Sequence, residues 1–241
     1  SSPDNPVGPP RVVVDPDLPR GVTFAVMRPW RPVQDTIAYN QGIMLDSLAQ
    51  AIINRRLEAR ARAGGSFLFA QINQEKVSRS ADATFVSVTP LDENWAKSLS
   101  EVRGVIADAL ATPPSEDEIE REVAEFNVAF ESAVEQRRLL AGAKLADDMV
   151  TALDMRETIS SPETVLEIFN TSRSLFTPEA VLDHTRLLFK GAVTRAVYVT
   201  PKAGEAEAAS LAAALAKPAV ADPKARPDSK PVTFAEMPAL G

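Results

Sequence analysis

Histidine, the side chain that most often binds metals and moves protons near neutral pH, occurs once in this 241-residue chain, at His184. A catalytic interpretation would make it a metal ligand or a base oriented by a carboxylate, and Asp183 directly precedes it. No second histidine exists to complete such a site, so we interpret His184 as a surface or half-buried helical residue without a functional role. The chain also lacks cysteine, which excludes disulfides, thiolate zinc sites and cysteine nucleophiles.

Two charged clusters are further candidate sites. The acidic run Glu116–Glu125 could hold a divalent cation, but it lacks calcium-loop spacing, and carboxylates in the first turns of a helix stabilise its positive dipole end without a metal. Arg55, Arg56, Arg60 and Arg62 lie at the C-terminal end of a predicted helix and could bind an acidic peptide or a phosphate. We favour a solvated face whose arginines pair with carboxylates of the same domain.

Motifs of the common enzyme classes are absent from the sequence. Gly64-Gly65 has neither the preceding strand nor the following Lys-Ser/Thr that a phosphate loop needs. No Gly-x-Ser-x-Gly elbow occurs, and one imidazole gives a serine triad little support. The sequence therefore predicts no catalytic, cofactor-binding or metal-ligating residue in this chain, and it leaves the substrate-binding residues unassigned.

The composition is that of an acidic chain with a hydrophobic core, since 45% of its residues are apolar. A net charge of −7 repels a phosphate backbone, so we expect no nucleic-acid partner. No apolar run approaches the roughly 18 residues of a membrane span. The chain starts at Ser1 without a methionine, and we expect a processed product or a fragment of a longer protein.

Apolar periodicity predicts strands and a long helix near the start of the chain. Val22–Met27 suits a buried strand, and Val12–Val14 a second, shorter one. Apolar residues then recur at three- and four-residue steps, which predicts a helix of about 25 residues. We expect Asp35 as its N-cap and Gly64-Gly65 as its end.

A hairpin and an amphipathic helix follow. Phe67–Ile72 and Thr84–Val88 predict two antiparallel strands with a long solvated end between them, and Pro90 stops the second. Trp95–Leu110 carries one apolar face and predicts a helix that ends before Thr112-Pro113-Pro114.

Hydroxyl caps mark three later helices. Ser115 and Glu118 form a predicted capping box. The apolar face after it could run for about 40 residues, too long for one domain to cover, so we expect a break near Ala141-Gly142. Ser161-Pro162-Glu163 and Thr177-Pro178-Glu179 each supply a capping hydroxyl, a proline at the first helical position and an acid in the first turn.

The end of the pattern sets the fold class. Gly191 is expected to end the last of these helices, Ala196–Val199 to form a final buried strand, and Glu205–Lys217 to form a terminal helix. Strands separated by a block of helices predict an α+β fold: a mainly antiparallel sheet with helices packed on one face. We place this domain at residues 11–217.

Proline-rich ends bound the predicted domain. Ser1–Pro10 and Pro218–Gly241 are rich in proline and small polar residues, which is typical of linkers. Val232-Thr233-Phe234 could be the first strand of a following domain.

In their order, these features resemble a repeat domain of the pitrilysin/insulinase family of zinc metallopeptidases. The resemblance spans roughly Arg11–Pro201 and rests on Asn54-Arg55-Arg56-Leu57, the hairpin, the helix start Pro114-Ser115-Glu116, and Ser161-Pro162-Glu163. It implies several similar domains that pair as two bowl-shaped halves around a closed chamber. One domain would hold zinc, and the others would shape the chamber and bind unfolded peptide.

The resemblance also implies that this chain is not the catalytic domain. The family's metal site needs a His-x-x-Glu-His helix, which a chain with one histidine lacks, so zinc is expected only in the catalytic domain of the parent protein. Some members place an arginine and a tyrosine of a hairpin against the substrate, where this chain offers Arg79 and Phe85. This departure favours the domain that directly follows the catalytic one.

Two functional hypotheses follow. The first is a non-catalytic structural and substrate-enclosing domain of a bacterial zinc endopeptidase, for which a periplasmic location is favoured over a cytoplasmic one. Its partners would be the other domains of the parent chain and a peptide substrate. The alternative is a free-standing binding or scaffold subunit that pairs with an active peptidase. A His-x-x-Glu-His upstream in the same reading frame supports the first, and a separate start codon supports the second.

Overall fold

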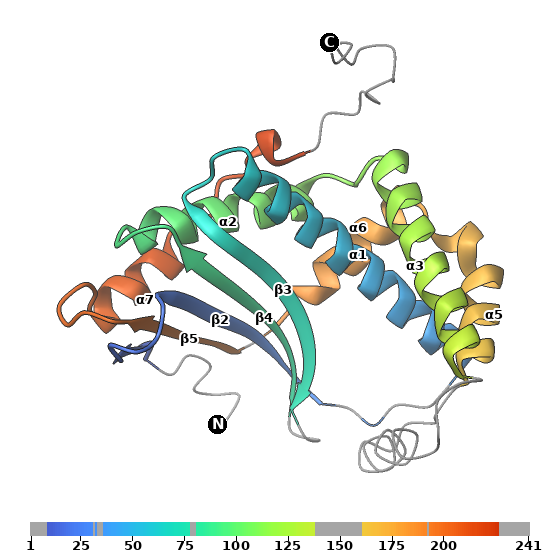
Figure 1. Ribbon diagram of the computed structural model, residues 1–241, viewed down its shortest axis with the longest axis horizontal. Coiled ribbons are helices and arrows are strands. Elements are labelled where there is room, and N and C mark those ends of the chain that lie inside the picture. Colours follow the sequence, from blue (N-terminus) through green and yellow to red (C-terminus); the bar gives the residue numbers. More distant parts are fainter. Residues whose placement is uncertain are drawn as a thin grey trace, which may run out of the picture.

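A five-stranded sheet and six α-helices form the part of the chain that the computed structural model describes, residues 9–30, 32, 36–77, 81–137, 161–191 and 193–226 (Figure 1). The strands are β1 (Arg11–Val14), β2 (Gly21–Pro29), β3 (Phe67–Val77), β4 (Ala81–Pro90) and β5 (Val193–Thr200). The helices are α1 (Ile37–Arg62), α2 (Trp95–Ala111), α3 (Glu116–Arg137), α5 (Pro162–Ser172), α6 (Pro178–Leu188) and α7 (Ala208–Ala216), with short 3-10 helices η1 (Arg173–Leu175) and η2 (Pro223–Ala225).

The sheet has the strand order β1-β5-β2-β4-β3 and is mainly antiparallel, which confirms the predicted α+β class. β2 pairs with β4 and β5, and β3 with β4, all antiparallel. Only β1 runs parallel to its neighbour β5. The sequence analysis does not predict this pairing, because β1 and β5 lie about 180 residues apart and parallel strands need a long crossover connection.

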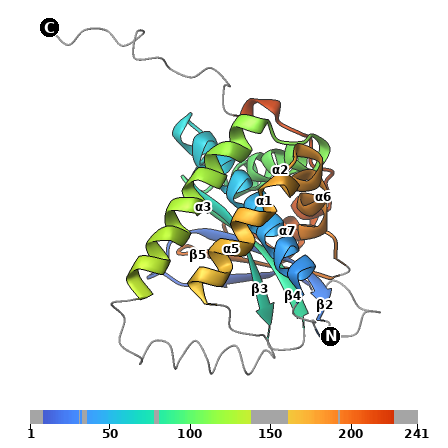
Figure 2. The ribbon, with the colours of Figure 1, turned by 90° about the vertical axis from the view of Figure 1, so that its right-hand side faces the viewer.

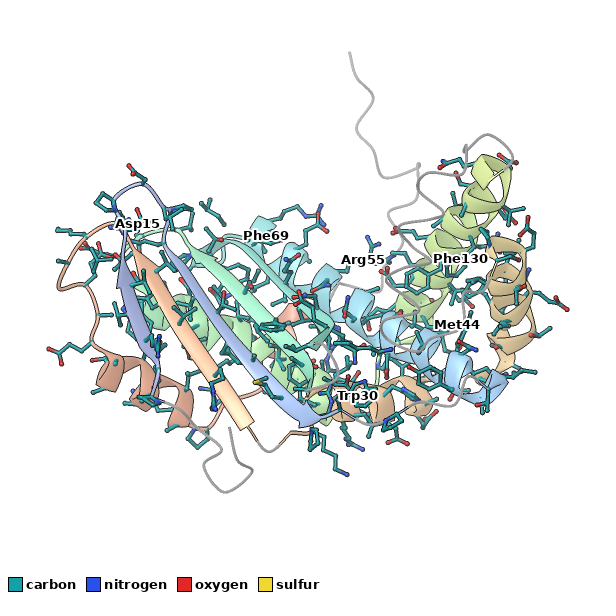
Figure 3. The ribbon with its side chains drawn as sticks, turned by 90° about the horizontal axis from the view of Figure 1, so that it is seen from below. Asp15, Trp30, Met44, Arg55, Phe69 and Phe130 are labelled. Carbon is teal, nitrogen blue, oxygen red and sulfur yellow. The ribbon has the colours of Figure 1, made fainter. Side chains whose placement is uncertain are left out.

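Helices cover one face of the sheet and enclose the core. Alternate residues of β2 and β4, such as Phe24 and Val86, point into this core and meet the apolar faces of α1 and α2 at residues such as Leu48 and Leu99. Seen from below, the strands lie in front of α2 and α7, and no helix of the described residues covers this second face (Figure 3).

α3 and α5 pack side by side against α1, beyond the edge of the sheet (Figure 2). Aromatic rings fill this contact: Phe169 is fully buried and lies edge-on to Phe130, with ring centroids 5.1 Å apart. Phe126 and Phe176 complete the cluster.

The predicted helix caps are largely confirmed. Ser161 and Thr177 accept from the third residue of α5 and α6, and Ser115 forms the capping box with Glu118 described below. The predicted N-cap of the first helix is wrong: α1 begins at Ile37, and Thr36 caps it by accepting from the amide of Tyr39.

Several predicted boundaries need correction, including those of the last strand, observed at Val193–Thr200, and of the terminal helix, observed at Ala208–Ala216. β3 extends to Val77 and β4 starts at Ala81, because polar residues such as Asn73 continue the antiparallel ladder at the end of the sheet. α6 ends at Leu188 rather than at Gly191. Gly191 is instead needed for close packing, because a Cβ there would lie 2.6 Å from the carbonyl oxygen of Met27. The break expected near Ala141-Gly142 and the strand expected at Val232-Thr233-Phe234 lie outside the described residues.

A hydrogen-bonded corner fastens the end of β5 to the loop before α7. The Glu205 carboxylate accepts from the guanidinium of Arg20 at 2.9 and 2.5 Å, from the Thr200 hydroxyl at 2.6 Å and from the Tyr198 hydroxyl at 3.0 Å. The hydrogen bonds from Arg20 lower the pKa of Glu205 to about 2, with those from Thr200 and Tyr198 acting in the same direction.

We expect the free energy of unfolding to fall as the pH is lowered from about 5 towards 2. A carboxyl whose pKa is lower in the folded state stabilises the fold above its unfolded pKa, and this contribution is lost as the pH falls through the folded pKa. Urea unfolding at a series of pH values would measure the effect. Glu205→Gln, which cannot ionise, should make the profile shallower between pH 2 and 5, and an unchanged profile would contradict this assignment.

Candidate functional site

The arginines of α1 pair with acids of α2 and α3, so the two charged clusters of the sequence form one network. Arg56 is 1% exposed. Its Nε and Nη2 donate to the two carboxylate oxygens of Glu118 at 2.7 and 2.9 Å, and its Nη1 donates to Asp108 at 3.3 Å. The predicted carboxylate partners are therefore confirmed, but the prediction of a solvated face is wrong for Arg56, because α2 and α3 enclose it.

The other arginines lie nearer the surface. Arg55 pairs with Glu122 and, at 2.6 Å, with Glu125. Arg60 pairs with Glu101. Arg62 is the residue that fits the predicted solvated face, since its side chain is 67% exposed and contacts Glu58 one turn earlier in α1.

Three acids of the run on α3 thus face α1 and pair with its arginines. Glu118, Glu122 and Glu125 recur at four- and three-residue steps, which places them on one face of the helix. No group of three or more His, Cys, Asp or Glu within the described ranges is arranged to hold a metal ion. These carboxylates neutralise buried or half-buried arginines, a role that the spacing alone does not reveal.

Glu118 links this network to the start of α3. Its carboxylate accepts from the Ser115 amide at 3.0 Å, while its own amide donates to the Ser115 hydroxyl at 3.2 Å, which confirms the predicted capping box. Burial alone would raise the pKa of Glu118, but hydrogen bonds and charge from Arg56, together with Ser115, lower it below its ordinary value. Glu118 is therefore ionised, and its carboxylate is hydrogen-bonded by both Arg56 and Ser115.

His184 lies half-buried on α6 and pairs with a carboxylate of another helix. Its Nδ1 is 2.7 Å from Oδ1 of Asp46 on α1, whereas Asp183 lies 3.6 Å from Arg186. The orienting carboxylate is thus 138 residues away in sequence rather than adjacent. Nothing in the local sequence signals this pair.

A pocket of about 740 Å³ opens beside this pair, between the first half of α1, the ends of β2–β4 and α6. Arg28, Lys76 and Asp82 line its sheet side and are direct neighbours across the strands. Arg28 donates to the Thr84 hydroxyl at 3.2 Å and to the carbonyl of Leu188. The described residues that line the pocket include no serine, threonine or cysteine.

The hairpin pair implied by the resemblance is only partly described. Phe85 lies on β4 between Ala25 of β2 and Asn73 of β3. Because its neighbour Val86 points into the core, Phe85 points to the face of the sheet that no described helix covers. Arg79 lies outside the described residues.

The outer edge of β3 is occupied by side chains of α1. The Asn54 side chain accepts from the Ile72 amide at 2.7 Å and donates to the Ile72 carbonyl at 3.0 Å, so it replaces one residue of a neighbouring strand. Gln50, one turn earlier, accepts from the Gln74 amide at 3.1 Å. In Asn54-Arg55-Arg56-Leu57, asparagine therefore satisfies backbone groups that an open sheet edge would expose to another chain.

Within the described ranges no helix is both long and apolar enough to span a membrane. No known family model matches the sequence, and no curated protein does. Solved structures do match its fold. The first half of the periplasmic protease PqqL from Escherichia coli matches with a TM-score of 0.75 and 15% identity, covering 87% of this chain and 46% of that one.

Two further structures match in the same way. A predicted insulinase family protease from Yersinia pestis gives a TM-score of 0.71 at 15% identity, over 86% of this chain and 45% of that chain. A peptidase M16 inactive domain from Pseudomonas fluorescens gives a TM-score of 0.56 at 14% identity, over 83% of this chain and 45% of that chain. This chain therefore spans less than half of each of these structures, and 26% of the longer PqqL structure.

The structural match confirms the resemblance drawn from the order of caps, hairpin and helices. The match extends over 87% and 86% of this chain in two peptidase structures that share 15% of their residues with it. The chain has the fold of an M16, or insulinase-family, peptidase domain.

Proposed function

We propose that the chain is a non-catalytic domain of a zinc endopeptidase, which encloses peptide substrate together with a zinc-bearing domain. The observation that carries the proposal is the combination of an M16 domain fold with a sequence that contains one histidine and no cysteine. Such a sequence cannot supply the three protein ligands of a catalytic zinc site in the His-x-x-Glu-His arrangement. Zinc and its activated water would therefore come from another domain.

The charged residues of the domain support a structural role. Arg55, Arg56 and Arg60 each pair with carboxylates from other helices, and His184 pairs with Asp46. These groups fix the helices relative to one another. None of them pairs a serine, threonine or cysteine with a base, the arrangement that covalent peptidases use.

Exposed apolar side chains support a neighbouring domain. Leu68 and Phe69 on β3 and Val128 on α3 are large, apolar and more than half exposed. A domain that belongs to a larger assembly exposes its contact surface when it is viewed alone. The matching structures are about twice as long as this chain, which leaves room for such a partner.

We also propose a bacterial and periplasmic origin and a domain that starts at residue 11 and extends past the expected limit of 217, because Asp222 and Arg226 bond to Gly104 and Asp108. The matching structures named above come from bacteria, and one of them is described as a periplasmic protease. The absence of cysteine is compatible with a periplasmic location. The position directly after the catalytic domain is proposed from the hairpin, where Phe85 stands in place of a tyrosine.

We expect hydrolysis only when this chain is combined with a zinc-bearing M16 domain encoded before it or beside it. The chain alone should cleave neither denatured protein nor short peptides and should hold less than one equivalent of zinc after dialysis. The zinc-bearing part alone should be poorly active, because an open site neither holds an extended peptide nor excludes water. Mixing the two should restore hydrolysis that a chelator abolishes.

Arg79→Ala tests whether the hairpin polarises the substrate, because in that case the substitution would strongly reduce the restored hydrolysis. We expect it to change the restored activity little. Chelator-sensitive hydrolysis by this chain alone would overturn the proposal. A large loss with Arg79→Ala would place the domain in the opposite half of the enzyme.

A further inference from the structure

The chain does not leave the domain at the end of α7 but crosses α2 as far as Arg226 (Figure 1). The Asp222 amide donates to the carbonyl of Gly104 at 3.1 Å. A Cβ at residue 104 would lie 3.1 Å from the carbonyl oxygen of Val220, so glycine allows this close approach. Arg103 donates to the carbonyls of Ala214 and Lys217, both at 2.8 Å, and fixes the end of α7 before the crossing.

Ion pairs anchor the crossing segment, Pro218–Arg226, at both ends of η2. Arg226 donates from Nε and Nη2 to the two carboxylate oxygens of Asp108, at 2.8 and 2.7 Å, and also to the Thr112 hydroxyl at 3.0 Å. Asp222 lies 3.7 Å from Arg60 on α1. A bidentate guanidinium–carboxylate pair is both stronger and more directional than a single hydrogen bond.

Arg226 supplies the charge that the buried cluster beneath it lacks. Arg56, Asp108 and Glu118 are 1%, 2% and 6% exposed and together carry one positive and two negative charges. Arg226 adds a second positive charge, so the cluster of four residues is neutral. Without it, one negative charge would stay buried without a counterion, which is costly in a low-dielectric interior.

Asp108 is shared between the segment and the start of α3. Its Oδ2 accepts from Arg226 and from Arg56, and Arg56 holds both carboxylate oxygens of Glu118, the residue that caps α3. A continuous series of hydrogen bonds therefore joins Arg226 to the first turn of α3. Such a network can transmit a change at one end to the other.

We propose that Pro218–Arg226 is a docked strap that sets the position of the first turn of α3 through Asp108 and Arg56. When Arg226 leaves, Arg56 must neutralise two carboxylates, and its hold on Glu118 weakens. Release of Arg226 would then act on α3, which packs with α5 against α1 (Figure 2). The inference does not depend on the proposed peptidase role.

Hydrogen exchange followed by mass spectrometry on the full chain tests the proposal. In Arg226→Gln, amides of the strap and of Glu118 and Ile119, which bond to Ser115, should exchange at least about tenfold faster, because a charge-assisted hydrogen bond is lost at a buried acid. Amides of β2 and β4 should be unchanged. Lys224→Gln is the matched control, since it removes the same charge from an exposed side chain two residues away and should change neither region.

A second variant isolates the shared acid. Asp108→Asn leaves Glu118 as the only charged partner of Arg56, so α3 should keep its protection, and adding Arg226→Gln to it should not speed exchange there, because no second carboxylate competes for Arg56. The proposal is overturned if the strap opens in Arg226→Gln while α3 keeps its protection. It is equally overturned if β2 and β4 accelerate as much as α3, which would indicate general destabilisation, or if neither region changes.

Discussion

Replacing Arg56 with alanine is expected to lower the free energy of unfolding by about 3–5 kcal/mol, the cost of breaking a buried ion pair by removing one partner. The guanidinium is 1% exposed and donates to both Glu118 and Asp108. Its removal leaves Glu118 without its main counterion in a site where burial opposes ionisation. Urea denaturation followed by circular dichroism would measure the loss.

Arg62→Ala is the matched control for Arg56→Ala. The Arg62 side chain is 67% exposed and pairs only with Glu58 on its own helix in the interactions that the structure describes. We expect a change of about 0.5 kcal/mol or less there, as for most exposed ion pairs. A loss below about 1 kcal/mol for Arg56→Ala would show that water solvates the cluster and that the buried network contributes little.

Removing the charges of both Arg56 and Glu118 should lower the free energy of unfolding less than removing that of Arg56 alone. In Arg56→Met combined with Glu118→Gln, Asp108 still pairs with Arg226, and no carboxylate is left without a partner. The double variant should therefore be more stable than Arg56→Ala, because an uncompensated buried charge costs more than the absence of the pair. The comparison separates the cost of the orphaned charge from the loss of packing.

The elements of this fold could be predicted from the sequence because their signals are local. The capping hydroxyls of Ser115, Ser161 and Thr177 lie within three residues of the amides that they satisfy. The apolar steps that end at Leu57 predict the face of α1 that enters the core. Spacing of this kind depends only on helix geometry.

The connections between elements could not be predicted in the same way. Arg56 and Arg62 lie about 1.7 turns apart in one basic patch. One is buried and the other exposed, and this difference depends on where α2 and α3 pack. His184 finds its carboxylate on α1 rather than at Asp183. Such pairs are set by tertiary contacts, and a single sequence carries no signal for them.

Asn54 shows how a recognisable motif can have an unforeseen physical role. Asn54-Arg55-Arg56-Leu57 contributes to the resemblance to the peptidase family, but its residue types serve three different contacts. Asn54 closes the edge of β3, Arg56 enters the buried cluster, and Leu57 is fully buried in the core. Adjacent positions on a helix point in different directions, so a four-residue motif can contact the edge of β3, the buried charged cluster and the core at once.

Asn54→Ala is expected to destabilise the domain by about 2–3 kcal/mol, because it leaves both the amide and the carbonyl of Ile72 without their partner beside α1. Both hydrogen bonds come from one side chain, at 2.7 and 3.0 Å. The variant also reopens the sheet edge to pairing with another chain, so self-association should rise with protein concentration.

Two variants define the cause. Asn54→Asp keeps an acceptor for the Ile72 amide but loses the donor to the Ile72 carbonyl. Its free energy of unfolding should therefore lie between those of the wild type and Asn54→Ala. Asn73→Ala removes a half-buried β3 side chain that bonds only to Glu75 among the described contacts and should cost about 0.5 kcal/mol or less. Urea denaturation would measure stability, and sedimentation velocity would measure association. If Asn54→Ala and Asn73→Ala had the same stability and the same degree of association, α1 as a whole would protect the edge of β3, rather than the Asn54 side chain alone.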